Sequence, residues 1–246
     1  MTRYKLILEY DGTSYSGWQK QENAPTIQQT IEEAFKQFLG RSVEVVGSGR
    51  TDAGVHALGQ VAHVDVEGEK WNCDTLMSAT NHFLKNTGIA VVSIETTSDQ
   101  FHARFDARER HYYYHILNRR APLTWQRTQA WQVYQGLDCD AMTEAAVCLI
   151  GHHDFSSFRD SQCQSLSPVK TLNKITITRQ KESLLVHVSA RSFLHHQVRI
   201  MVGTLVEIGR GKWRSSYIQD ILDAKDRRAA GPTAPAQGLY FERIDY

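Results

Sequence analysis

The sequence predicts an α+β fold made of two ferredoxin-like halves, each with the element order βαββαβ. Two observations support this prediction. Runs with strand-like alternation and runs with helical spacing follow one another in that order, and the order occurs twice along the 246 residues. We expect a central, mostly antiparallel sheet, with an active-site cleft between residues 1–100 and residues 101–246.

The first half, residues 1–100, begins with a strand in which Tyr4 and every second residue up to Tyr10 share one face. Thr26 followed by Gln29 is typical of a capping box, and the apolar residues after it recur at helical spacing until Gly40. Further strands are predicted at 43–48, 60–66 and 89–96, with a helix capped by Asp74 before the last of them.

The second half, residues 101–246, begins with the segment that leads into a Tyr-rich strand at 108–118. A helix capped by Asp138 or Asp140 and an irregular stretch at 152–169 come next. We then expect a hairpin of strands 172–178 and 184–190, helices at 193–208 and 215–224, and a last strand at 239–244.

Composition narrows the functional classes. The net charge of +1 excludes a polycation, so any nucleic-acid binding must come from local clusters of charge. The four cysteines form no C-x-x-C pair, which disfavours a zinc or redox site. The N-terminus shows no signal peptide, and no apolar run approaches the ~20 residues that span a bilayer. These features favour a cytoplasmic protein without a membrane segment.

A glycine-rich loop at 47–56 concentrates chemical groups between two strand-like runs. No Lys-Ser or Lys-Thr follows its glycines, and a strand rather than a helix comes next, so neither a Walker loop nor a dinucleotide fingerprint fits. Asp52 offers a carboxylate that can act as a nucleophile or general base. The alternative is an ordinary polar loop with an internal Arg50–Asp52 pair.

Three segments combine basic and aromatic residues, at 15–20, 101–115 and 125–134. In the second of these, Arg104, Arg108 and Arg110 alternate with aromatics. Arginine binds phosphates and aromatic rings stack on unpaired bases, so the segment favours RNA binding. The alternative is a strand whose tyrosines pack in the core while its arginines are exposed.

The segment 193–199 places two histidines and an arginine at the expected start of a helix. Arg199 lies among apolar positions, where a charge needs a partner such as a carboxylate. A solvated basic face remains open as an alternative. A metal site with the histidines at 152–153 and 195–196 is disfavoured, since adjacent histidines diverge on a helix and no H-E-x-x-H pattern occurs.

The run Gly49-Arg50-Thr51-Asp52-Ala53-Gly54-Val55-His56 resembles the active-site motif of the pseudouridine synthases of the TruA family. Segments 10–19, 101–105, 154–159, 193–199 and 224–240 are also similar to that family, in its order and spacing. The resemblance covers essentially the whole chain and implies the pseudouridine synthase fold.

The resemblance implies an isomerase that converts uridine to pseudouridine in the anticodon stem-loop of tRNA, at the positions conventionally numbered 38 to 40. Asp52 would be the catalytic nucleophile, with Arg199 as its partner. Tyr112 would pack against the target base and assist removal of its C5 proton, and Arg50 would contact the flipped nucleotide or fill its space. The family uses no cofactor and no metal, and works as a homodimer on tRNA.

Two further segments would bind the tRNA substrate by the same resemblance. Their residues are Phe101, His102, Ala103, Arg104 and Phe105, and Gln162, Cys163, Gln164, Ser165 and Leu166.

Two other functions remain open at this stage. One is a non-catalytic tRNA-binding or RNA-chaperone module on the same scaffold, which would not need Asp52. The other is a metal-dependent hydrolase that uses the histidines.

Overall fold

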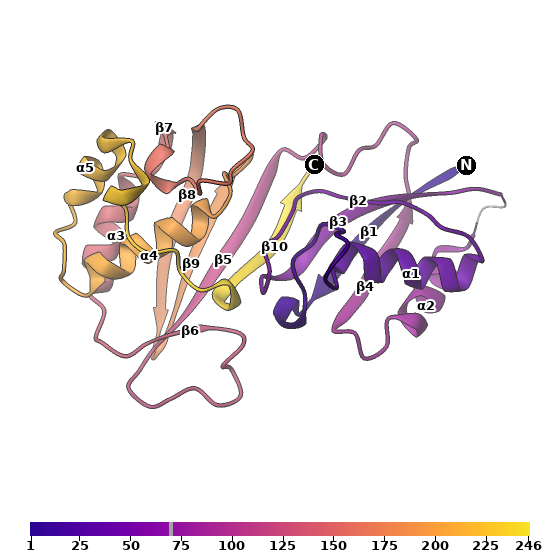
Figure 1. The fold of residues 1–246 in the computed structure, drawn as a ribbon, viewed down its shortest axis with the longest axis horizontal. Helices are drawn as coiled ribbons and strands as arrows, with labels where there is room; N and C mark the ends of the chain where they lie inside the picture. The colour runs from indigo at the N-terminus through magenta and orange to yellow at the C-terminus, as the bar shows by residue number, and fades with distance from the viewer. Residues whose placement is uncertain (69–70) are drawn as a thin grey trace. The chain divides into compact units, whose positions relative to one another are not determined.

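The computed structural model describes residues 1–68 and 71–246, and its contacts group them into two compact units (Figure 1). The first unit comprises Met1–Arg108 and Phe241–Tyr246, and the second comprises Glu109–Tyr240. Helices and mostly antiparallel strands occur in both, which confirms the predicted α+β class. Among the described residues, no helix combines the length and the apolar character needed to cross a membrane.

The first unit follows the predicted order βαββαβ. Its elements are β1 (Thr2–Tyr10), α1 (Ile27–Leu39), β2 (Val45–Gly47), β3 (His56–Val66), α2 (Cys73–Phe83) and β4 (Ile89–Thr96), with the later part of β10 (Leu239–Asp245). Strand β1 lies between β4 and β3 and is antiparallel to both, while β2 and β10 also lie beside β3. Helix α1 packs against α2.

Local sequence explains most of these elements. The alternating residues of β1 that begin at Tyr4 are buried, as the pattern predicts. The Thr26 side chain caps α1 by accepting a hydrogen bond from the Gln29 amide, and Gly40 ends the helix with a φ of 70°. Asp74 does not cap α2: the Asn72 side chain does so, by accepting from the amides of residues 74 and 75.

The second unit contains the predicted strands and helices together with two short strands, β6 and β7, that the sequence did not predict. Its elements are β5 (Glu109–Asn118), β6 (Trp131–Val133), α3 (Cys139–Val147), β7 (Gly151–Asp154), β8 (Val169–Gln180), β9 (Ser183–Ala190), α4 (Gln197–Gly209) and α5 (Tyr217–Ala224). Antiparallel pairing gives the strand order β5-β9-β8-β7. The prediction of an irregular stretch at 152–169 was wrong for residues 152–154, because these residues belong to β7, which pairs with β8. Asp138, one of the two predicted residues, caps α3.

Helix α4 is the buried helix of the second unit. It begins at Gln197 rather than at residue 193, because His196 has a φ of 60° and cannot extend the helix. Every residue from Ile200 to Gly209 is buried, so this helix packs all round rather than along one stripe. A side chain at Gly203 would place Cβ only 1.8 Å from the Pro232 carbonyl oxygen, which shows how closely the segment 231–234 packs on the helix.

Candidate active site

The loop at 47–56 is held by the segment that follows β1. The Trp18 amide donates to the Thr51 carbonyl at 3.0 Å, and the Tyr10 hydroxyl and Thr51 Oγ1 are hydrogen-bonded at 2.8 Å. The Gly12 amide donates to Nδ1 of the buried His56 at 3.1 Å. These bonds hold the middle and the C-terminal end of the loop against residues 10–18. Near the start of the loop, the Ser48 amide donates to the Val61 carbonyl at 2.8 Å, so the loop has a fixed backbone.

Glycine is required where the segment after β1 touches the loop at 47–56. A Cβ at Gly12 would lie 2.0 Å from the Val55 carbonyl oxygen, and one at Gly17 would lie 2.6 Å from the Thr51 carbonyl oxygen. Gly17 also has a φ of 96°, a conformation that other residues rarely adopt. The glycines at 12 and 17 therefore let residues 10–18 approach the loop at 47–56.

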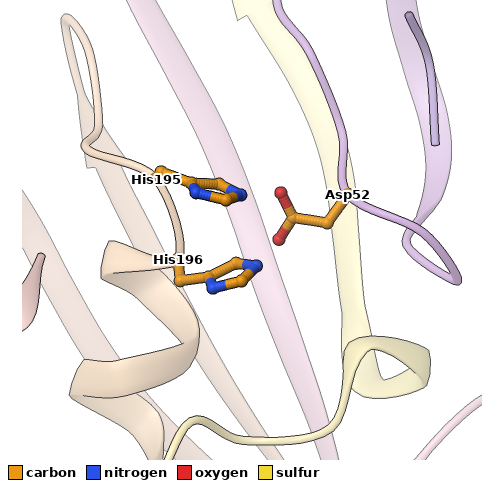
Figure 2. A group of neighbouring side chains, drawn as sticks. All are labelled: Asp52, His195 and His196. Atoms are coloured by element: carbon orange, nitrogen blue, oxygen red, sulfur yellow. The ribbon is translucent and has the colours of Figure 1, made fainter. Parts of the chain in front are cut away.

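Asp52 lies half-buried in this fixed loop, and Figure 2 shows its side chain leaving the loop of the first unit. Arg50 is exposed, and its Nε donates to Gln19 Oε1 at 3.1 Å. Gln60 supports the loop from β3, because it donates to the Gly49 carbonyl at 2.9 Å and accepts from the Ser48 hydroxyl at 2.5 Å. The arrangement offers a carboxylate with a fixed approach and a neighbouring exposed cation.

Trp18 corrects one prediction. The segment 15–20 was expected to offer an aromatic surface for RNA, but Trp18 is only 2% exposed. Its ring fills the space over Gly47, where a Cβ would lie 2.5 Å from the indole, and it approaches the Tyr10 ring. Trp18 therefore packs against the loop at 47–56, so its ring is not available to stack on a base.

Tyr112 occupies β5 of the second unit, opposite Val188 of β9. It is 9% exposed, and its ring meets the Phe193 ring edge to face at 5.3 Å. Tyr113 points to the other face, where it stacks on Tyr240 with a centroid distance of 4.6 Å. The strand thus presents Tyr112 on the same face as the segment before α4.

Arg199 is half-buried in the first turn of α4 and is tied to the segment 231–234 in both directions. Its Nε donates to the Ala234 carbonyl at 2.8 Å, and the Ala234 amide donates to the Arg199 carbonyl at 3.0 Å. The Gly231 amide adds a bond to Thr204 Oγ1 at 2.9 Å. This clasp fixes the direction of the guanidinium, as a partner for a buried carboxylate requires.

The segment 160–166 is anchored to the residues before α4. The Asp160 carboxylate accepts a hydrogen bond from His196 Nδ1 at 2.8 Å and lies 3.7 Å from His195 Nδ1. Burial alone would raise the pKa of Asp160, but the Gln162 amide and the two histidines lower it overall. Asp160 therefore stays ionised beside the two imidazoles.

The two histidines precede α4 instead of lying on it, which corrects the expectation that they diverge on a helix. Their ring centroids lie 3.9 Å apart with the ring planes tilted by 31°. Figure 2 shows the two side chains next to each other. Imidazole and carboxylate groups are metal ligands in principle. The hydrogen bond between His196 Nδ1 and Asp160 fixes the orientation of the His196 ring within its unit.

The backbone of 162–166 is shaped by Arg159, whose Nη2 donates to the Cys163 and Ser165 carbonyls at 2.9 and 2.6 Å. The His195 amide donates to Cys163 Sγ at 3.3 Å. Burial would raise the pKa of the Cys163 thiol, but hydrogen bonds from His195, Ser165 and Arg159 lower it overall. Leu166 is fully exposed at the end of this segment.

The segment 101–105 belongs to the first unit, as does the loop at 47–56. Ala103 is completely buried, whereas Phe105 is 71% exposed and Arg104 is exposed beside it. The Arg104 guanidinium lies 5.8 Å from the centre of the Phe105 ring. The buried alanine thus anchors a turn that offers a cation and an aromatic ring to solvent.

The predicted site residues fall into two sets. Asp52, Arg50 and 101–105 lie in the first unit, while Tyr112, Arg199 and 162–166 lie in the second. Within the second unit the structure joins 162–166 to the segment before α4 through Asp160, a residue that sequence reasoning missed. An aspartate beside an irregular loop gives no distinguishing signal, because its partners lie 35 or more residues away.

Comparison with known proteins gives a consistent result. The sequence model of one family, described as tRNA pseudouridine synthase, matches residues 6–106 and 145–246. The chain is 51% identical over 246 residues to the tRNA pseudouridine synthase A of Maricaulis maris, covering 100% of this chain and 98% of that relative. It is also 51% identical to the proteins of the same name from Parvibaculum lavamentivorans and Xanthobacter autotrophicus, with 100% of each chain covered.

Among solved structures, a chain of a Cbf5–Nop10–Gar1 complex matches with a TM-score of 0.34 and 10% identity. The match covers 92% of this chain and 69% of that chain. A similarity this low supports no conclusion about function.

Proposed function

Because the chain belongs to the tRNA pseudouridine synthase family, we propose that it is an isomerase that converts uridine to pseudouridine in tRNA. The family membership confirms the resemblance seen in the motifs. The finer proposal is that the target uridines are those at positions 38 to 40 in the anticodon stem-loop. The observation that carries the proposal is Asp52, a half-buried carboxylate on a loop whose backbone is fixed at both ends.

The reaction breaks the bond between N1 of the base and C1′ of the ribose, turns the base, and joins C5 to C1′. The proton on C5 then leaves and N1 gains one, so the product is an isomer of the substrate. In our proposal the Asp52 carboxylate acts as the nucleophile, its bond to the substrate breaks again before the product leaves, and no cofactor or metal takes part. The fixed loop supports this role, because a carboxylate with a set approach needs little reorganisation in order to attack.

Other side chains have roles that follow from the same proposal. Arg199 pairs with Asp52, which favours its ionised form and sets its direction. Tyr112 packs against the base and assists loss of the C5 proton. A uridine in a stem must leave the stack at a cost of a few kcal/mol, and Arg50 offsets this by occupying the space of the flipped nucleotide.

The tRNA is held by its shape and phosphates in this proposal, through 101–105 and 162–166. Exposed Arg104 and Phe105 support the first contact, and exposed Leu166 supports the second. We further propose that the protein acts in the cytoplasm as a homodimer, with both subunits contacting one tRNA. Light scattering of the purified protein tests the dimer, and a single-chain mass would contradict it.

Substitution of Asp52 by Asn tests the function. Wild-type protein is expected to release tritium from tRNA labelled at C5 of uridine, and Asp52→Asn is expected to release none while still binding the tRNA. Asp74→Asn, which changes an exposed carboxylate of the same unit, should behave as wild type. Tritium release by Asp52→Asn would refute the role of Asp52. A wild-type protein that binds tRNA without forming pseudouridine would instead favour the non-catalytic binding module.

A further inference from the structure

Side chains of the first unit form hydrogen bonds with the backbone of the segment 99–106 and hold it in place. Arg3 of β1 donates from Nη1 to the carbonyl oxygens of Asp99 and Phe101, at 2.6 and 2.8 Å. The other side of the same guanidinium is bidentate to Asp65 of β3, with distances of 2.7 and 2.6 Å. One arginine thus joins two neighbouring strands to this segment.

The buried centre of the segment is held by two more side chains. Nδ1 of His63 on β3 accepts a hydrogen bond from the Ala103 amide at 3.2 Å. The Tyr246 hydroxyl donates to the Ala103 carbonyl at 2.7 Å. Both backbone groups of this completely buried residue are therefore satisfied by side chains.

The segment also closes on itself. The His102 amide donates to Asp106 Oδ2 at 2.8 Å, and His102 Nδ1 accepts from the amides of Arg104 and Phe105 at 3.1 and 3.3 Å. The backbone is thereby fixed, while the side chains of Arg104 and Phe105 remain exposed. A ligand that binds those side chains meets a turn that is already ordered.

We propose that Arg3, Asp65 and His63 form a backbone clamp that positions Arg104 and Phe105 for tRNA. This rests on the proposed function, and it assigns the three residues as positioning residues that act through the segment 99–106. Arg3 itself is not a phosphate ligand in this proposal, because its side chain is only 18% exposed and is paired with Asp65.

Substitution of Asp65 by Asn distinguishes the clamp from direct phosphate binding by Arg3, because the two roles predict opposite changes in tRNA affinity. Removal of a negative charge beside Arg3 would strengthen tRNA binding if Arg3 contacted phosphate. If Arg3 acts as a clamp, Asp65→Asn loosens the segment and weakens binding of an unmodified tRNA transcript about fivefold or more, as expected for the loss of about one charge-assisted hydrogen bond. Glu67→Gln removes the same charge from an exposed side chain close by and serves as the control.

Hydrogen exchange provides a readout that involves no RNA. Peptides that cover 99–106 should exchange faster in Asp65→Asn than in wild type or Glu67→Gln, while peptides from β1 stay protected. Equal exchange and equal tRNA affinity in Asp65→Asn and Glu67→Gln would overturn the clamp. Faster exchange in Asp65→Asn, with a wild-type protein that forms no pseudouridine, would support the clamp and refute the proposed function instead.

His63 gives a second, independent test. His63→Leu replaces the imidazole by an apolar side chain of similar size and leaves the Ala103 amide without its acceptor. His63→Asn provides a carbonyl oxygen close to the position of Nδ1. We expect His63→Leu to raise the tRNA dissociation constant and His63→Asn to restore part of the loss. Wild-type affinity and exchange in His63→Leu would contradict the role of His63.

Discussion

Substitution of Gly203 by Ala tests how Arg199 is held in place. Gly203 lies in the middle of α4, where its Cβ position is 1.8 Å from the Pro232 carbonyl oxygen and 3.3 Å from the Ala234 nitrogen. Real Cβ atoms stay at least 3.0 Å from such a neighbour, so the segment 231–234 must move by about 1.2 Å or more. This carbonyl belongs to the backbone and cannot turn aside as a flexible side chain would.

The movement has a calculable cost. A shift of that size away from α4 breaks two hydrogen bonds. One runs from Arg199 Nε to the Ala234 carbonyl at 2.8 Å, and the other runs from the Ala234 amide to the Arg199 carbonyl at 3.0 Å. Each bond is worth about 1 kcal/mol, and overpacking adds about 1 to 3 kcal/mol. Alanine favours a helix over glycine by about 1 kcal/mol, which offsets part of the loss. We expect Gly203→Ala to reduce the free energy of unfolding by about 3 kcal/mol.

Urea unfolding followed by circular dichroism measures this change, and two other glycines of the same unit calibrate it. Nothing lies within 4 Å of a Cβ at Gly136, so Gly136→Ala should change the stability by less than about 0.5 kcal/mol. In Gly209→Ala the new Cβ would lie 2.6 Å from the Met142 sulfur, which is part of a flexible side chain. The loss of stability in Gly209→Ala should therefore lie between the losses in Gly136→Ala and Gly203→Ala.

The result also bears on the reaction. Because Arg199 loses its anchor, the folded fraction of Gly203→Ala should form pseudouridine more slowly, while its affinity for tRNA stays close to that of wild type. A Gly203→Ala protein as stable as Gly136→Ala would refute the argument, since it would mean that the segment 231–234 moves without cost.

Three smaller predictions follow from single contacts. Asp138→Ala removes the cap of α3, where the carboxylate accepts from the amides of residues 140 and 141 at 3.0 Å, and should cost about 1 kcal/mol in urea unfolding; an unchanged midpoint would refute this. Tyr114→Phe removes the 2.7 Å bond to the Pro235 carbonyl and should also cost about 1 kcal/mol, with no loss of packing. The pKa of His63 is lowered from 6.5 to about 4, chiefly by burial and also by the nearby charges of Arg3 and His102. Asp65 and Asp106 raise this pKa, but by less. The unfolded chain then binds the proton first, so stability falls as pH drops from about 6.5 to about 4, and His63→Asn should show a smaller fall in that window.

Local patterns in the sequence were enough to predict the elements of the first unit. The buried face of β1 follows from alternation alone, and both ends of α1 follow from Thr26 and Gly40. The choice between Asn72 and Asp74 as the cap of α2 needed the structure, since both side chains favour that position. The division into domains at residue 100 stays a prediction.

For the candidate site, the sequence alone proposed the Asp52 loop, Tyr112, Arg199 and the two segments 101–105 and 162–166, through motifs whose residues are neighbours in the chain, and their roles stay predictions. It could not place Trp18, which has the appearance of a surface aromatic in a polar loop yet is buried over Gly47. Nor could it place the start of α4, since helical spacing continues through His196 while the backbone there has a positive φ. Periodicity reports only which face a residue shares with its near neighbours.

The sequence by itself determined the fold class and the family, because these are encoded in short patterns of residue type, and the same patterns nominated the candidate reactive side chains. Only the tertiary structure decided how those side chains are supported. Arg3 reaches Phe101 across 98 residues, and Arg199 reaches Ala234 across 35, by hydrogen bonds to backbone carbonyls. Every residue has such a carbonyl, so no residue type in the sequence marks the partner, and only the folded chain brings each pair within reach.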